Sequence, residues 1–503
     1  MSLRHVSTRL SRSATGFSQR RHASASVAAS SLPSALKNAI SKDAALATPD
    51  PPSDSQTSSI VNSQLPFMVP TYVRPPPMFQ KGEGCYLWDV ENRKYLDFTA
   101  GIAVNSLGHC DAEFSKLIYQ QAQTLVHTSN LYHNPWTGAL SKSLVEKTLE
   151  SGAMHTASKA FICNSGSEAN EAAIKFARKV GKHLSSSSPE ADTKTHFLSF
   201  TNSFHGRTMG SLSATPNPKY QKPFSPMVPG FTHGTLNDIA ALPTLITPQT
   251  CGVIVEPIQG EGGIHTATPS FLLALRKHCT AVGAVLIYDE IQCGLGRTGH
   301  LWAHGALPRE AHPDILTTAK ALGNGFPIGA TLVNEFVASK IQTGDHGTTF
   351  GGNPLGARLA HYILSRLSDP ALHAAVRAKE QVFRAHFRAL QARFPGYIAA
   401  ADGDGEQGGS AAVRGKGLIL GLQLTVDPAP VVTAARERGL LVITCGTNTL
   451  RFVPPLVISE AEIDEGMGIL GEAMAVVFGR GDGQGEGEGE GVPGTEGQQE
   501  MVR

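Results

Sequence analysis

The chain has 503 residues, of which 41% are hydrophobic, and it carries a formal net charge of +1 at pH 7. That length allows two packed domains with a large core, and so nearly balanced a charge gives no reason to expect nucleic-acid or membrane partners. No apolar run approaches the roughly twenty residues of a membrane span. The seven cysteines lack metal-ligand spacing, so we expect free thiols and no metal site.

The N-terminal segment differs in composition from the rest of the chain. Residues 1–42 contain no acidic side chain and are rich in serine, with arginines spread along them: Arg4, Arg9, Arg12, Arg20 and Arg21. This composition is typical of a mitochondrial transit peptide and lacks the apolar core of a secretory signal, although a disordered basic tail has the same composition. We expect a transit segment over residues 1–45, a polar linker over 46–65, and a fold that begins near Pro66.

A hairpin, a loop and two helices are expected next. Apolar and polar residues alternate over residues 85–98 around a central Glu-Asn turn, which predicts a β-hairpin. A loop of small residues follows over 99–111. The pattern over 113–125 predicts an amphipathic helix, and Pro135 favours the start of another.

The stretch FICNSGSEANE, residues 161–171, predicts a strand that ends in Ser165-Gly166-Ser167 and is followed by an amphipathic helix. Ser165 and Glu168 have the spacing of a capping box, which explains these residue types structurally. The free amides of a glycine-containing helix N-terminus also bind phosphate, because the unpaired N–H groups and the helix dipole favour an anion. The two interpretations are compatible.

Two further strands lead to polar loops. THFLSF is followed by Phe204 and His205, which ordinary packing explains, although an aromatic ring there is also suited to lie over a flat cofactor. Arg207 is either a surface charge or a group that binds a substrate carboxylate. The strand CGVIVE is followed by Glu261, whose role the pattern leaves open. Strands near residues 160, 196, 253 and 286, each with polar residues at its C-terminal end, predict a mostly parallel sheet in an α/β fold.

The functional prediction depends most on residues 282–299 and on the lysine that follows them. The apolar run VLIY predicts a buried parallel strand that delivers Asp289 and Glu290 to the edge where open α/β sheets bind ligands. An aspartate there can sit opposite a cationic ring nitrogen, and Lys320 on the next loop can form an imine with an aldehyde. Together they indicate pyridoxal phosphate (PLP). A helix N-cap and a surface lysine are the ordinary alternatives.

The same stretch contains Gly294, Gly296 and Gly299 in the pattern G-x-G-x-x-G, which is also the fingerprint of a dinucleotide-binding turn. That turn should open a helix directly after a strand. Here Asp289 to Cys293 intervene, and later glycine and proline residues would break the helix. We therefore discount a nicotinamide cofactor.

A resemblance to a known family rests on motifs that occur in order between residues 66 and 479: NSGSEANEAAIKFAR, SFHGRT, EPIQGEGG, LIYDEIQCGLGRTG, AKALGNGFPIGA, HGTTFGGNPLG and LRFVPPLVI. Together they resemble the class III, ω-type aminotransferases, which are PLP-dependent transferases of fold type I. The resemblance implies a large PLP-binding domain, residues 126–365, whose mostly parallel sheet is flanked by helices. A smaller α/β domain would comprise residues 66–125 and 366–479. We expect the acidic Gly-rich tail, residues 480–503, to be disordered.

The resemblance also implies roles around the cofactor. Lys320 would hold PLP and then move a proton between substrate and cofactor, and Asp289 would pair with the pyridinium nitrogen. The other residues implied to bind the cofactor are Gly166, Ser167, Phe204, Glu290, Ile291, Gln292 and Thr349. Of these, Gly166 and Ser167 would bind the phosphate, and Thr349 would reach the phosphate of a neighbouring subunit. A homodimer with shared active sites is therefore implied.

The resemblance is closest to the members that transfer the terminal amine of N-acetylornithine to 2-oxoglutarate in fungal mitochondria, forming N-acetylglutamate 5-semialdehyde and glutamate. Arg207 would bind the α-carboxylate of acetylornithine, and Thr348 would contact substrate. Arg451 would bind the α-carboxylate of 2-oxoglutarate or glutamate, with Glu261 as its partner when that substrate is absent. This predicts an enzyme of arginine biosynthesis in the mitochondrial matrix.

Three alternatives stay open. Ornithine δ- and γ-aminobutyrate (GABA) aminotransferases use the same residues on free ω-amines, although the small GIAVN loop, residues 101–105, argues against them. A non-catalytic binding protein with this fold would not need the set Lys320, Asp289, Arg207 and Arg451. A dinucleotide-dependent dehydrogenase rests on the glycine pattern alone.

Overall fold

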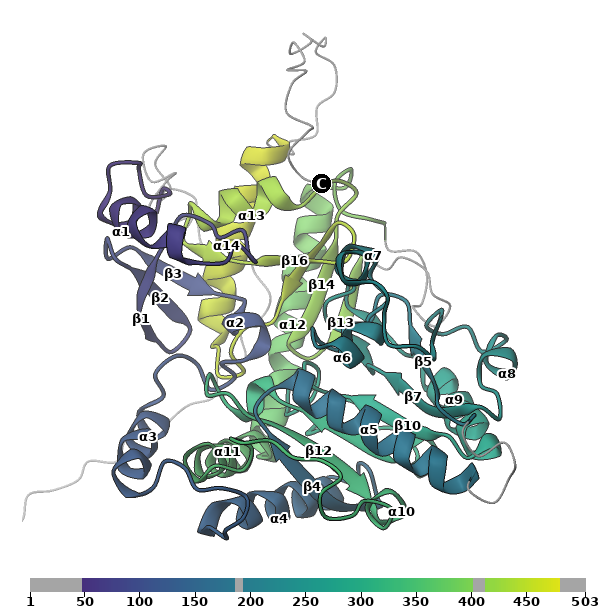
Figure 1. The fold of residues 1–503 in the computed structure, drawn as a ribbon. Coiled ribbons are helices and arrows are strands. Elements are labelled where there is room, and N and C mark those ends of the chain that lie inside the picture. Colours follow the sequence, from purple (N-terminus) through teal and green to yellow (C-terminus); the bar gives the residue numbers. More distant parts are fainter. Residues whose placement is uncertain (1–47, 186–192, 401–411, 480–503) are drawn as a thin grey trace, which may run out of the picture. The chain divides into compact units, whose positions relative to one another are not determined.

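The computed structural model describes residues 48–185, 193–400 and 412–479 (Figure 1). The expected transit segment and acidic tail lie outside the described residues.

The helices are α1 Gln56–Gln64, α2 Ala100–Ala103, α3 Ala112–Thr124, α4 Pro135–Glu150, α5 Gly166–Ser185, α6 Met209–Ser213, α7 Pro218–Gln221, α8 Leu242–Leu245, α9 Pro269–Val282, α10 Glu335–Ala338, α11 Pro354–Leu367, α12 Pro370–Arg393, α13 Ala429–Arg436 and α14 Glu460–Phe478. Short 3-10 helices are η2 Leu65–Phe67, η3 Lys222–Phe224, η4 Arg309–Ala311 and η5 Lys320–Leu322. The strands are β1 Phe79–Glu83, β2 Tyr86–Asp89, β3 Lys94–Asp97, β4 Ala157–Cys163, β5 His196–Phe200, β6 Phe231–Gly234, β7 Thr250–Val255, β8 Ile258–Gln259, β9 His265–Thr266, β10 Val285–Asp289, β11 Ile315–Thr318, β12 Gly329–Asn334, β13 Val413–Lys416, β14 Ile419–Gln423, β15 Leu440–Leu441, β16 Ile443–Cys445 and β17 Thr449–Phe452.

The central sheet of the described chain has seven strands in the order β4-β12-β11-β10-β7-β5-β6. Strand β12 runs antiparallel to both of its neighbours, and all other neighbouring strands are parallel. The predicted mostly parallel sheet is confirmed, with each of the four expected strands in it. Strands β7 and β10 are buried along their whole length, which explains their continuous apolar sequences.

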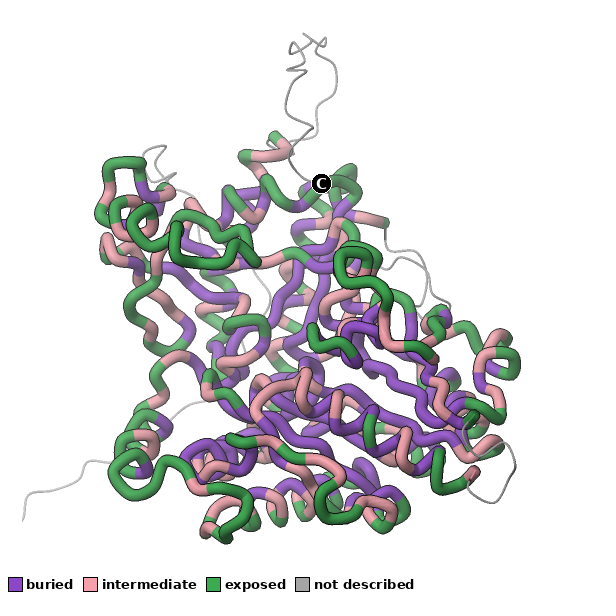
Figure 2. The backbone as a smooth tube through the Cα atoms, in the orientation of Figure 1, coloured by how far each residue is buried: buried purple, intermediate pink, exposed green. Residues whose placement is uncertain are grey.

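Different helices cover the two faces of this sheet. Because side chains alternate along a strand, Ile287 of β10 packs with the apolar face of α5, and its neighbour Leu286 packs with α9 on the other side. Burying one such side chain contributes about 1.5–3 kcal/mol. Figure 1 shows α5 lying across one face, and Figure 2 shows the strands beneath it as buried. These layers fix the strand ends in place.

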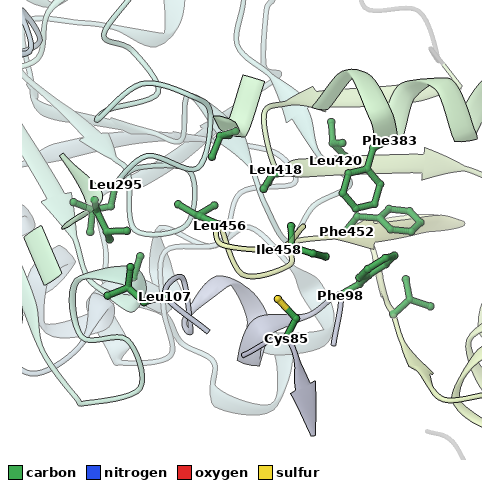
Figure 3. Packing of buried hydrophobic residues seen from close by; sticks show 14 of the residues in the cluster. Cys85, Phe98, Leu107, Leu295, Phe383, Leu418, Leu420, Phe452, Leu456 and Ile458 are labelled. Carbon is green, nitrogen blue, oxygen red and sulfur yellow. The ribbon is translucent and has the colours of Figure 1, made fainter. Parts of the chain in front are cut away.

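The N-terminal strands and the C-terminal part of the chain pack together. Strand β3 pairs in parallel with β15 in a sheet of order β1-β2-β3-β15, and β13-β14-β17-β16 form an antiparallel sheet. Figure 3 shows Phe98, Phe383 and Phe452 close to one another, and the ring centroids of Phe98 and Phe383 lie 5.4 Å apart. The expected hairpin and helices are confirmed as β2-β3, α3 and α4.

The fold begins before Pro66, so that prediction is wrong. Helix α1 precedes it, with Ser55 as N-cap, and the hydroxyl of Thr57 donates to Glu91 of the hairpin at 2.7 Å. The serine-rich composition that predicted a linker instead supplies a helix cap and polar contacts, because these side chains satisfy backbone groups as readily as they solvate a linker. None of the described helices is long and apolar enough to cross a membrane.

Candidate active site

A cavity of about 300 Å³ lies at the carboxyl edge of the central sheet. Its wall is built from the segments that follow β4, β5, β7, β10 and β11, so the polar residues at those strand ends surround one space. The sequence-predicted residues that line it are Gly166, Ser167, Phe204, Asp289, Ile291, Gln292 and Lys320. This volume is at the lower end of the range for pockets that hold small organic ligands.

Lys320 begins η5, two residues after β11 ends, and its side chain lines the cavity. Its φ of 43° lies in the left-handed region, a costly conformation for a residue with a side chain and one that clusters at functional sites. Burial lowers the pKa of its amine to about 8, with a further contribution from the positive charge of Arg451. A larger fraction of this amine than of an ordinary lysine is therefore neutral, and nucleophilic, near physiological pH.

The carboxylate of Asp289, the last residue of β10, is held by three donors. Nδ1 of His205 and Nδ2 of Asn170 both donate to Oδ2 at 2.8 Å, and the backbone N of Ile291 donates to Oδ1 at 3.0 Å. A carboxylate has about four acceptor positions, so these bonds fix its orientation and leave room for one more donor. Asp289 also lines the cavity, where a ligand can supply that donor.

Two of these supporting residues carry no sequence signal specific enough to assign their role. Asn170 lies in the first turns of α5, and its Oδ1 accepts from Thr317 of β11 at 2.8 Å. The backbone N of His205 donates to Thr215 at 2.8 Å, which holds the ring beside Asp289. The sequence feature that points to a role for Asn170 is an asparagine on an otherwise apolar, buried helix face, because a buried amide needs hydrogen-bond partners.

The N-terminus of α5 opens onto the cavity. The hydroxyl of Ser165 accepts from the backbone N of Glu168 at 3.2 Å, while the Glu168 carboxylate accepts from the backbone N of Asn164 at 2.8 Å. The predicted cap is present, with its reciprocal bond one residue earlier than expected. A Cβ on Gly166 would lie 2.9 Å from the Ile291 side chain, so a larger residue here would displace Ile291 from its place in the cavity wall. Gly166 and Ser167 thus present the helix terminus to the cavity, a geometry suited to a phosphate.

Beside the cavity, the structure brings Arg451 and Glu261 together as predicted. Nη1 of Arg451 donates to Oε2 of Glu261 at 2.7 Å, to the carbonyl of Gly260 at 2.8 Å and to Oε1 of Gln292 at 3.3 Å. The Arg451 side chain is 2% exposed and that of Glu261 is 34% exposed. A buried cation with a partly exposed carboxylate partner is a site at which another carboxylate can compete.

Glu290 does not line the cavity, which contradicts its predicted place among the cofactor ligands. Its carboxylate accepts from the backbone N and the Nδ1 of His304, on the far side of the strand end from Asp289. Glu290 directly follows β10, and its backbone N still donates to the carbonyl of Thr317 in the neighbouring strand, so the alternation of side-chain directions along the strand continues to Glu290. Glu290 therefore fixes the turn at Ala303–His304.

Three more predicted residues lie near the cavity without lining it. The guanidinium of Arg207 is exposed and lies 3.5 Å from the ring centroid of Tyr220. The hydroxyl of Thr348 accepts from Asn164 at 3.0 Å, which places it beside the N-terminus of α5. Thr349 is exposed.

The glycine-rich segment after β10 forms turns and opens no helix, so the dinucleotide alternative lacks its structural context. Its Arg297 is fully buried and donates to the carbonyls of Leu418 and Pro454 at 2.8 Å and to the hydroxyl of Ser106 at 3.2 Å. Val104, two residues before Ser106, lines the cavity. Arg297 thus fixes a loop that forms one wall, a role that the sequence motif did not reveal.

Comparison with known proteins agrees with this geometry. The family described as Aminotransferase class-III matches residues 68–474. The chain is 66% identical to "Acetylornithine aminotransferase, mitochondrial" of Neurospora crassa over 86% of this chain and 90% of that protein. N-acetylornithine aminotransferase from Stenotrophomonas maltophilia has a similar structure, with a TM-score of 0.67 at 34% identity over 83% of this chain and 99% of that one. An ornithine aminotransferase from Toxoplasma gondii, whose active site is partially occupied by PLP, has a TM-score of 0.74 at 29% identity over 84% and 95% of the two chains.

The fold is that of the PLP-dependent transferases of fold type I, with the cavity at the carboxyl edge of its large sheet. The chain belongs to the class III aminotransferase family. It is an aminotransferase, and this family works on small-molecule substrates with PLP.

Proposed function

We propose that the protein transfers the terminal amine of N-acetylornithine to 2-oxoglutarate, forming N-acetylglutamate 5-semialdehyde and glutamate in the mitochondrial matrix. The observation that carries the substrate is the 66% identity, over most of both chains, to a mitochondrial relative that is named for acetylornithine. The chemistry is supported by Lys320 and Asp289 in one cavity. The activity belongs to arginine biosynthesis.

The residues of the cavity fit PLP. Bound PLP supplies an aldehyde that bonds to amines and a ring that accepts electron density from the substrate carbon. Lys320 would hold the aldehyde end, and the fourth acceptor position of Asp289 would take the pyridinium N–H. Gly166 and Ser167 would bind the phosphate at the N-terminus of α5. Phe204 and Ile291 would cover the two ring faces and Gln292 would reach the phenolic oxygen; all three line the cavity.

The chain's own residues then move one proton. The free amine of Lys320 would take the proton from the reacting carbon of the substrate and would hold it for delivery to the carbon that becomes protonated. An amine with a pKa of about 8 suits both steps, because a group that titrates near the working pH gives and takes protons readily. Asp289, oriented by its three donors, would place its carboxylate opposite the ring nitrogen.

The pH dependence of cofactor capture follows from this lowered pKa. Only the neutral amine reacts with PLP, and its fraction rises as pH increases through about 8. We expect the rate at which the apoprotein captures PLP to rise up to about pH 9 and then level off. Stopped-flow absorbance from pH 6 to 10.5, with Nα-acetyl-lysine as the reference amine, measures this. A rate that keeps rising to pH 10.5 would show an unshifted lysine.

The pair of Arg451 and Glu261 allows one pocket to serve two substrates. The reacting end of acetylornithine has no carboxylate, so an unpaired buried Arg451 would be costly, or would bind the wrong end of the donor. A glutamate partner neutralises the arginine in the first half-reaction. The α-carboxylate of 2-oxoglutarate then replaces it in the second. Arg207 would bind the α-carboxylate of acetylornithine, and Thr348 would contact substrate near Asn164.

Replacing Glu261 by alanine should therefore affect the half-reactions unequally. We expect the first, with N-acetylornithine, to lose about 10-fold or more in kcat/KM, the value of a hydrogen bond to a charged group, while the second keeps its rate. Single-turnover absorbance with each substrate alone measures both. Glu261→Gln keeps the size of the side chain but not its charge, so its loss of kcat/KM in the first half-reaction should be smaller than that of Glu261→Ala. Equal losses in the two half-reactions would contradict the exchange.

A homodimer would complete the site. Large apolar side chains of the N-terminal segment and of the loop before α4 are exposed, among them Phe67 at 89% and Leu131 at 85%, and such exposure favours a protein partner. Exposed Phe350 adjoins Thr349. In a symmetric pair, Thr349 would reach the phosphate bound by the partner subunit. Sedimentation of the holoenzyme as a monomer at micromolar concentration would contradict this.

Steady-state glutamate formation with N-acetylornithine, ornithine and GABA as donors tests the proposed function. We expect the highest kcat/KM with N-acetylornithine. A higher value with ornithine would favour the activity in the name of the Toxoplasma relative, with which this chain shares its fold at 29% identity. Failure of all three donors would overturn the proposal.

A further inference from the structure

A second pocket, of about 510 Å³, adjoins the cofactor cavity. Phe204 lines both spaces, and Glu261 lies in the wall of the second. Its other polar side chains include Asn202, Asn217, Lys219, Thr444 and Thr447. The pocket is therefore a polar space directly beside the ion pair that the second substrate has to open.

The backbone around Glu261 is fixed on both sides. The carbonyl of Glu261 accepts from the backbone N of Gly446 at 2.9 Å. A Cβ built on the next residue, Gly262, would overlap the backbone oxygen of Asn202, so the two loops are in close contact. Rotation of the Glu261 side chain would let it leave Arg451 without moving these loops. The second pocket, whose wall Glu261 already forms, is the open space beside this side chain.

Two charged side chains, Glu261 and Lys219, line this pocket. Across the described ranges, Lys219 forms no ion pair and its Nζ makes no hydrogen bond. Arg207 lies outside the pocket wall, with its guanidinium over the ring of Tyr220. We propose that Lys219 receives the carboxylate of Glu261 when Arg451 binds a dicarboxylate substrate, which makes it a positioning residue for the second half-reaction. This inference rests on the proposed function.

The exchange is a two-state equilibrium of the Glu261 side chain. Arg451 stabilises one state, and Lys219 stabilises the other. A substrate carboxylate binds Arg451 only when Glu261 is in the state that Lys219 stabilises. Removing Lys219 therefore weakens the apparent binding of this substrate by the factor that Lys219 contributes to that state. For a solvent-exposed ion pair this factor is about three- to fivefold. The first half-reaction uses the other state and loses nothing.

The variant Lys219→Met removes the charge and keeps most of the side chain's length. We expect the KM for 2-oxoglutarate with the aminated enzyme to rise about three- to fivefold, with kcat and the first half-reaction unchanged. Lys219→Arg should restore the KM. Lys222→Met, at an exposed lysine outside the pocket, is the matched control. In a Glu261→Ala background the effect of Lys219→Met should vanish, because no carboxylate remains to be received.

Three results would overturn the inference. One is an unchanged KM for 2-oxoglutarate, and another is a loss in the first half-reaction, which would make Lys219 a contact of the donor. The third is an effect that persists in the Glu261→Ala background. Failure of the proposed function is separate from these. If the wild-type enzyme rejects N-acetylornithine but accepts another ω-amine, the KM for 2-oxoglutarate can still be compared between the variants. If the wild-type enzyme reacts with no amine, the proposed function and this inference both fail.

Discussion

Replacing Lys320 by alanine is expected to reduce turnover by about 10³-fold or more, the upper range for loss of a general acid–base group. Among the described residues, Lys320 is the one lysine in the wall of the cavity. The variant therefore loses both the amine that holds the cofactor and the group that moves the proton. Single-turnover absorbance with N-acetylornithine measures the loss, and mass spectrometry after borohydride reduction measures the covalent attachment of PLP.

Lys320→Arg is the matched control for this result. It keeps a positive charge on a long side chain, but a guanidinium stays protonated in proteins and gives no neutral nucleophile. We expect it to be as inactive as the alanine variant. Thermal unfolding of both variants checks that they fold. A turnover above one tenth of wild type in either would contradict the assignment of Lys320.

Replacing Asp289 by asparagine is expected to lower kcat by about 10²–10³-fold, comparable to the loss of one preorganised electrostatic contact at a reacting centre. The change removes the negative charge opposite the ring nitrogen. It also leaves one amide NH₂ facing a donor, since His205, Asn170 and the backbone N of Ile291 all donate to this carboxylate. We expect weaker PLP binding as well, measured by fluorescence titration of the apoprotein.

The support around Asp289 gives a graded control. His205→Gln removes the ring that orients the carboxylate while the charge stays, so its kcat should fall less than that of Asp289→Asn. A kcat within threefold of wild type for Asp289→Asn would contradict the role of this charge. An equal loss in the two variants would show that orientation matters more than charge.

The central part of the site was predictable because its signals are local. A continuous apolar run predicts a buried strand, and parallel strands bring their carboxyl ends to one edge, so Asp289 and the cap at Ser165 come together. Glu290, which directly follows the strand, accepts from the backbone of Ala303 and His304 and does not face the cavity. Strand alternation already predicts opposite directions for Asp289 and Glu290.

Other features depend on contacts that no local pattern contains. Asn170 and His205 are 119 and 84 positions from Asp289 in sequence, and only the fold brings them to its carboxylate. Helix α2 has φ values between 47° and 66°, in the left-handed region, and only one of its residues, Gly101, favours that conformation. The tertiary contacts of the loop that follows it, through Arg297 and Asn324, hold this backbone in place.

The measurement that tests the central claim most directly is the visible absorption of the purified holoenzyme during separate additions of N-acetylornithine, ornithine and GABA, without a keto acid. We predict that the band of bound PLP disappears fastest with N-acetylornithine and returns on addition of 2-oxoglutarate. Faster loss with ornithine or GABA would contradict the proposed substrate, and the absence of any band after added PLP would contradict the catalytic site itself.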